Sequence, residues 1–174
     1  MVAPPPDRTR AELEALAETH GRDRSALLPI LQAVMRRHHE ISDFAMQAIA
    51  DILKIPAVDV YGVVTFYAFL NQRYQGKFVV RLCRTISCAL QGTNAVARQL
   101  SQELGIQFGN TTPDGMFTLE YAHCLGMCDQ APALLVNDEV FVRVTPGQVS
   151  MIIDACRSNL QGSYPLRKEA VSWS

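Results

Sequence analysis

Apolar residues recur every three to four positions through the first part of the chain, a spacing typical of helices with one buried face. The pattern predicts a first helix over residues 10–19, which Gly21 ends. Thr9 and Glu12 have the spacing of a capping box at its start. Residues 1–8 are polar and rich in proline, and we therefore expect them to form a flexible leader.

Three further helices are predicted before the pattern changes. The second begins near Arg22, and the third follows Ser42 as its N-cap and ends before Pro56. Residues 57–64 are rich in β-branched side chains but keep a helical spacing of apolar positions, so we interpret them as a short helix, followed by a bend at residues 65 and 66. Short connections indicate antiparallel neighbours, and residues 9–74 are therefore predicted to form a helical bundle.

From residue 75 onward, helical spacing gives way to short runs typical of strands. The elements expected there are a strand over 77–82, a helix over 93–104, a strand over 117–121, a hairpin of 133–136 with 140–144, and a helix after Thr145–Pro146. This order predicts an α+β domain over residues 75–158, with helices packed against a small sheet. Residues 159–174 are interpreted as a loosely held tail.

The composition narrows the classes of function. Of the 174 residues 48% are hydrophobic, which is enough to bury a core, and the net charge is −1. A nearly neutral chain without a basic stripe is not typical of a nucleic-acid-binding protein. We expect neither a membrane span nor a secretory signal, because the sequence contains no run of about 18 apolar residues and begins with a polar segment. These features favour a cytoplasmic protein, in which paired cysteines bind metal or perform redox chemistry more often than they form structural disulfides.

Four of the five cysteines form two closely spaced pairs. Four residues separate Cys83 from Cys88, and three separate Cys124 from Cys128. Each pair lies at or just after the end of a predicted strand, so the two loops can meet at one edge of the sheet. Strand ends hold side chains more rigidly than free loops do, which suits a metal centre. The fifth cysteine, Cys156, lies on the apolar face of the last helix and is interpreted as a small buried hydrophobe.

Three kinds of site are compatible with two cysteine pairs. In a [2Fe–2S] cluster each iron would take two thiolates and two inorganic sulfides. Zinc also accepts four cysteines, but its sites typically use spacings near C-x2-C. A thioredoxin-type redox pair would need C-x-x-C, which the sequence lacks. We favour the cluster, for whose sulfurs Thr85, Ser87 and Gly126 offer hydroxyl and backbone donors.

The two cysteine loops resemble those of a known family. Residues 83–92 (CRTISCALQG) resemble the first cluster loop, and residues 124–132 (CLGMCDQAP) the second, of the small iron–sulfur subunit of NADH dehydrogenases of the complex I kind. Residues 60–67 (VYGVVTFY) and 28–32 (LPILQ) are similar to upstream segments of that family, and the likeness extends over residues 22–158. Related subunits serve NAD-linked hydrogenases and NAD-dependent formate dehydrogenases.

The resemblance implies a thioredoxin-like [2Fe–2S] ferredoxin domain behind the helical bundle. It implies that Cys83 and Cys88 bind one iron and that Cys124 and Cys128 bind the other. It also implies a partner flavoprotein that binds FMN and NAD(H), further iron–sulfur subunits, and a place in the cytoplasm or at the cytoplasmic face of a membrane complex.

The chain would then act as an electron-transfer subunit of an NAD(H)-dependent oxidoreductase. We expect no dinucleotide site on the chain itself, because a strand followed by G-x-G-x-x-G is absent from the sequence. We expect no catalytic residues and no complete active site, because no nucleophile–His–acid set stands out. The alternative hypothesis is a zinc-stabilised interaction module that recruits a partner through its helical bundle.

Overall fold

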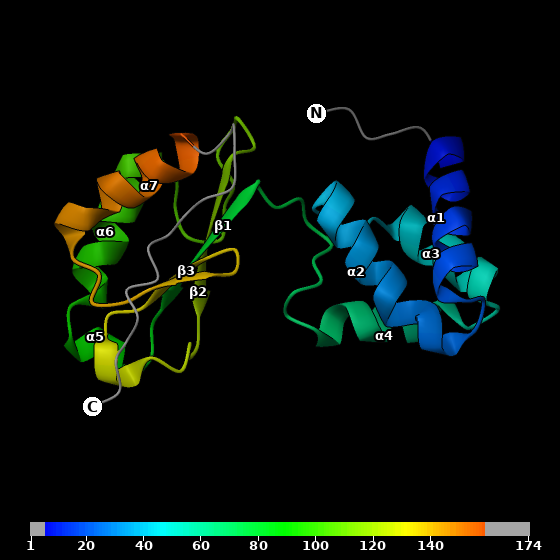
Figure 1. The fold of residues 1–174 in the computed structure, drawn as a ribbon, viewed down its shortest axis with the longest axis horizontal. Helices are drawn as coiled ribbons and strands as arrows, with labels where there is room; N and C mark the ends of the chain where they lie inside the picture. Colours follow the sequence, from blue (N-terminus) through cyan, green and yellow to red (C-terminus); the bar gives the residue numbers. More distant parts are fainter. Residues whose placement is uncertain (1–5, 159–174) are drawn as a thin grey trace. The chain divides into compact units, whose positions relative to one another are not determined.

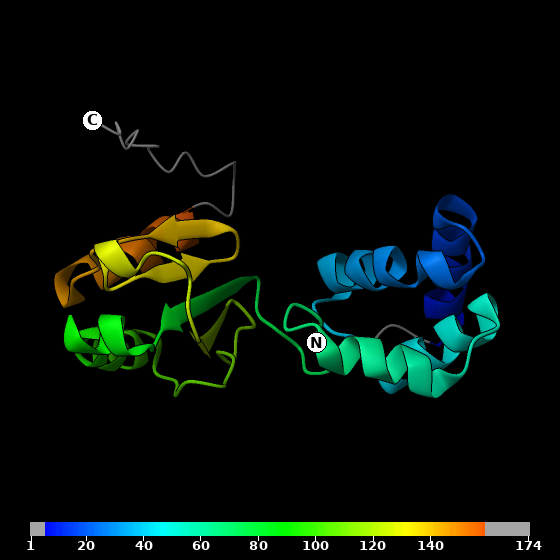
Figure 2. The ribbon, with the colours of Figure 1, turned by 90° about the horizontal axis from the view of Figure 1, so that it is seen from below.

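The computed structural model describes residues 6–158 and divides the chain into two compact units, Met1–Gln75 and Gly76–Ser174 (Figure 1, Figure 2). Within the described residues, none of the helices combines the length and the apolar character that crossing a membrane requires. Positions 1–5 of the predicted leader and the predicted tail over 159–174 lie outside the described residues.

The first unit is built from helices. They are α1 (Pro6–His20), α2 (Leu27–His38), α3 (Asp43–Leu53) and α4 (Ala57–Phe66), with a 3-10 turn over Arg24–Ala26 before α2. Their buried faces share one core, whose largest fully buried side chains are Leu13, Ile30, Leu31, Ile41, Ile49 and Val60. Each helix therefore buries the apolar stripe that predicted it, as expected for helices stabilised mainly by packing.

The starts of α1 and α3 differ in how well they match the prediction. Ser42 caps α3 as predicted, because its hydroxyl accepts a hydrogen bond from the Ala45 amide at 3.2 Å. α1 begins at Pro6 instead of residue 10, so Thr9 lies inside the helix and the capping box predicted there is wrong. Proline is favoured in a first turn because the N–H that it lacks would have no partner within the helix.

α2 and α4 differ from the prediction at one end each. α2 begins only at Leu27, because the Asp23 carboxylate accepts from the Ser25 amide at 2.8 Å and so starts a 3-10 turn first. The short helix predicted from residue 57 is confirmed, but α4 continues to Phe66 and the chain leaves it at Tyr67. The bend predicted at residues 65 and 66 is therefore wrong.

The second unit combines a small sheet with helices. Its elements are β1 (Phe78–Cys83), α5 (Ile86–Leu90), α6 (Thr93–Leu104), β2 (Phe117–Ala122), β3 (Leu134–Val136), β4 (Glu139–Phe141) and α7 (Val149–Ser158). The strand order is β2-β1-β3-β4, with β1 parallel to β2 and the other neighbours antiparallel. This arrangement confirms the predicted α+β class. It differs from the prediction in two ways: the second strand of the hairpin, β4, is shorter than expected, and the helix α5 was not predicted.

α6 and α7 lie together beside the sheet (Figure 1) and share its core. The largest fully buried side chains there are Leu82, Leu100, Phe117, Leu119, Leu134 and Ile153. On the opposite face Arg81 of β1 pairs with Glu120 of β2, whose carboxylate lies 3.1 Å from the arginine Nε. Cys83 lies opposite Ala122 in the parallel register. The loops that follow β1 and β2 therefore begin at neighbouring points on one edge of the sheet.

Candidate metal centre

The first cysteine pair lies where the central strand ends and a short helix begins. Cys83 is the last residue of β1, and Cys88 lies within α5. Each of the two side chains is only 1% exposed. Between them the chain turns through Arg84 and Thr85, and Thr85 has the extended backbone of an N-cap residue (φ −67°, ψ 163°). The helix therefore turns the second thiol back toward the strand end that holds the first.

The second cysteine pair lies on an exposed loop after β2. The Sγ atoms of Cys124 and Cys128 are 3.5 Å apart, and both side chains are exposed. Gly126 has a φ of 82°, a left-handed conformation that glycine adopts without steric cost. Its amide donates to the Cys124 sulfur at 3.4 Å. This tight turn folds the loop so that its two sulfur atoms come together.

The two loops meet in a small apolar cluster around the first pair. The cluster's other members are Leu125, Met127, Ala131 and Ala133. The Cys83 thiol donates to the His123 carbonyl at 3.0 Å, and the Cys83 amide donates to the Ala133 carbonyl at 3.1 Å. Within residues 6–158, no three Cys, His, Asp or Glu side chains are grouped closely enough to hold a single metal ion. The predicted site residues thus lie at one end of the sheet as a buried pair and an exposed pair.

Hydrogen-bond donors and burial act differently on the individual thiols. Burial raises the pKa of Cys83, but hydrogen bonds from Thr85 outweigh it and hold the pKa below its ordinary value. Burial also raises the pKa of Cys88, which stays above its ordinary value. The hydrogen bond and charge of Cys124 raise the pKa of Cys128. Of these three thiols, Cys83 is therefore the most readily deprotonated.

Cys156 lies in α7, away from both pairs. It is 5% exposed within the core of the second unit, which confirms its interpretation as a buried hydrophobe, and burial raises its pKa to about 11. We expect it to resist alkylation by iodoacetamide at pH 8 in the folded apoprotein, because only roughly one such thiol in a thousand is then ionised. Peptide mass spectrometry checks this, with the exposed Cys124 and Cys128 as internal controls. Labelling of Cys156 as fast as Cys124 would contradict the structure.

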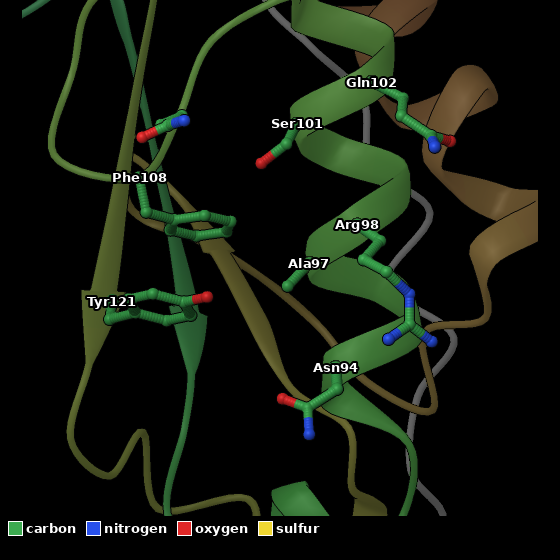
Figure 3. A pocket seen from close by; sticks show the side chains of 8 residues that line it. Asn94, Ala97, Arg98, Ser101, Gln102, Phe108 and Tyr121 are labelled. Carbon is green, nitrogen blue, oxygen red and sulfur yellow. The ribbon is translucent and has the colours of Figure 1, made fainter.

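A separate hollow of about 470 Å³ lies between α6 and β2 (Figure 3). Phe108 and Tyr121 stack there with ring centroids 4.0 Å apart and planes 10° from parallel, facing Ala97 and Ser101 of α6. The Arg84 guanidinium lies over the Tyr121 ring, 5.4 Å from its centroid. None of the four paired cysteines, all in the described part of the chain, lines this hollow, so it is distinct from the candidate metal centre.

Comparison with known proteins gives a family and a set of relatives. Residues 13–157 match the family described as thioredoxin-like [2Fe-2S] ferredoxin. A subunit of the NADH-quinone oxidoreductase of Pseudomonas aeruginosa is 36% identical over 146 residues, covering 84% of this chain and 88% of the relative. The corresponding subunit of the Escherichia coli NADH-quinone oxidoreductase is 35% identical over 147 residues, covering 83% of this chain and 89% of the relative. These matches confirm the resemblance that the cysteine loops indicated.

Two hydrogenases are also similar to the chain, over part of their length. The alpha subunit of the NAD-reducing hydrogenase HoxS of Cupriavidus necator is 34% identical over 143 residues, which cover 82% of this chain but only 24% of that subunit. A crystal structure of an air-oxidized NAD+-reducing [NiFe]-hydrogenase aligns with a TM-score of 0.67 at 21% identity, covering 80% of this chain and 24% of that one. At this identity the structural match supports the fold alone.

Proposed function

Because the chain belongs to the thioredoxin-like [2Fe-2S] ferredoxin family, we propose that it is an electron-transfer subunit that holds one [2Fe–2S] cluster. In this proposal Cys83 and Cys88 bind one iron, and Cys124 and Cys128 bind the other. The observation that carries the proposal is the meeting of the two loops, one following each of two adjacent parallel strands. Four thiolates presented as two pairs are the ligand set that a two-iron cluster requires.

The geometry of the pairs supports this assignment. A tetrahedral metal ion bound by two thiolates at about 2.3 Å holds their sulfur atoms about 3.8 Å apart. The 3.5 Å between the sulfurs of Cys124 and Cys128 is close to that value. The lowered pKa of Cys83 means that this thiol ionises more readily than an ordinary cysteine, as metal binding requires. The donor set and the spacing of the exposed pair therefore fit the proposed group.

The protein's own contribution is to hold, cover and orient the ligands. When bound, the cluster would supply a centre that accepts and returns one electron. Leu125 and Met127 pack against the buried pair and limit the access of water to it. The Gly126 amide and the Thr85 hydroxyl donate toward sulfur, which stabilises negative charge there. The exposure of Cys124 and Cys128 leaves one side of the site open to a partner protein.

The named relatives support an assembly with partner subunits, because they are subunits of NADH-quinone oxidoreductases and of an NAD-reducing hydrogenase. We propose that this chain works in an assembly of that kind or in an NAD-dependent formate dehydrogenase. It would exchange electrons there with a flavoprotein that binds FMN and NAD(H), beside further iron–sulfur subunits. A cytoplasmic location is part of the same proposal.

Metal analysis of the isolated full-length protein tests the cluster. After anaerobic reconstitution with iron and sulfide, we expect a brown protein with about two irons and two sulfides per chain. Dithionite is expected to bleach it partly and to produce a one-electron paramagnetic signal. A colourless protein that instead takes up one zinc ion per chain with high affinity, and no iron or sulfide, would support the zinc-stabilised module.

A further inference from the structure

Thr85 occupies the N-cap position of α5, but its hydroxyl does not act as a cap. A threonine in this position normally accepts a hydrogen bond from an amide of the helix's first turn. Among the described residues of α5, no such amide donates to the Thr85 hydroxyl. The hydroxyl lies 3.2 Å from the sulfur of Cys83 instead. A contact that would support the helix is replaced here by a contact with a proposed cluster ligand.

The direction of this hydrogen bond follows from the state of the sulfur. Metal binding would remove the Cys83 proton, and with it the hydrogen bond that the thiol donates to the His123 carbonyl. A thiolate can only accept, so the Thr85 hydroxyl must then donate. Because Cys83 is only 1% exposed, its sulfur depends on a protein donor such as the Thr85 hydroxyl more than on water.

We propose that the Thr85 hydroxyl raises the reduction potential of the cluster by donating a hydrogen bond to the Cys83 sulfur. This inference rests on the proposed function. Reduction adds one electron from an external reductant, breaks no bond, and increases the negative charge on the sulfur ligands. A donor aimed at sulfur stabilises the reduced form more than the oxidised form, so the potential rises. Thr85 is thus a residue that tunes the site without binding the metal.

The midpoint potential of the reconstituted full-length protein, measured by dye-mediated titration with dithionite, tests this role. Thr85→Val keeps the shape of the side chain but removes the hydroxyl, and we expect a shift to a more negative potential. Thr85→Ser keeps the hydroxyl, and we expect the wild-type potential. Thr85→Ala provides a second variant without the hydroxyl, in case the valine prevents loading of the cluster.

Thr145 provides a matched control, because it is a threonine that does take part in capping. It shares a capping box with Gln148, whose side-chain oxygen accepts from the Thr145 amide at 2.9 Å and from the Thr145 hydroxyl at 3.2 Å. Thr145→Val is expected to lower the melting temperature of the apoprotein and to leave the potential unchanged. Thr85→Val is expected to change the potential while the apoprotein melts close to the wild type.

The outcomes separate this inference from the proposed function. A wild-type chain that takes up no iron and sulfide would refute the proposed function itself. The wild type could load while Thr85→Val and Thr85→Ala have the same potential as the wild type or a higher one. That result would overturn the role of the Thr85 hydroxyl and leave the proposed function intact. If neither variant loads while Thr85→Ser does, the hydroxyl is needed to hold the cluster, and the tuning role is likewise overturned.

Discussion

Cys88→Ala is expected to abolish cluster binding, reducing iron and sulfide per chain by about tenfold or more after reconstitution. The substitution leaves one proposed iron with a single protein thiolate, in a pocket where Cys88 is 1% exposed and water cannot easily replace the ligand. Cys124→Ala is expected to abolish cluster binding as well, because it removes one of the two exposed ligands proposed for the other iron. Iron and sulfide assays, with the visible absorption spectrum, provide the measurement.

Cys156→Ala is the matched control, because it removes a thiol that is also buried but lies in the core away from both loops. We expect it to bind the cluster as the wild type does. Wild-type loading of Cys88→Ala would refute the ligand assignment. In an assembled complex, NADH turnover that continued after Cys124→Ala had removed the cluster would refute the relay role while leaving the metal assignment intact.

The regular parts of the fold could be predicted because their signals are local. Ser42 caps the start of α3, and Pro56 marks the boundary between the end of α3 and the start of α4, through effects that involve only nearby residues. Residues 57–66 were harder, because their β-branched content favours a strand while their spacing favours a helix. Burial of Val60 and Val64 against the other helices decides for the helix, which is a tertiary effect.

The short helix α5 could not be predicted, for a physical reason. Five residues make little more than one turn, which is too short for a hydrophobic period to appear. The stacking of Phe108 on Tyr121 was also missed, since the two residues come from different segments and meet only in the folded unit.

The cysteine spacing was sufficient to nominate the four site residues, but not to predict how their surroundings differ. Cys83 and Cys88 are buried because the end of β1 packs beside Ala133, which leads into β3. Cys124 and Cys128 are exposed because their loop leaves the sheet after β2, at its edge. Burial of a loop residue depends on which strands become neighbours, and strand order is not a property of the loop's own sequence.

Phe117→Ala is expected to destabilise the second unit by about 3–5 kcal/mol, which is a large share of the stability of a small domain. Phe117 is 1% exposed, stacks on Phe78 with ring centroids 5.4 Å apart, and packs among the residues that join the sheet to α6 and α7. Alanine would leave a cavity that a four-stranded sheet with few helices cannot readily close. Because the chain has two compact units, amide hydrogen exchange over residues 76–158 measures the effect in the relevant unit.

Phe66→Ala makes the same chemical change at the end of α4, where the phenylalanine is 78% exposed. We expect it to alter the free energy of unfolding by no more than about 0.5 kcal/mol, because little apolar surface is lost from the core. Equal losses for the two variants would mean that the Phe66 ring is buried in the native protein. A small loss for Phe117→Ala alone would mean that the sheet and helices of the second unit do not pack around this ring, and the described position of the cysteine loops would lose its support.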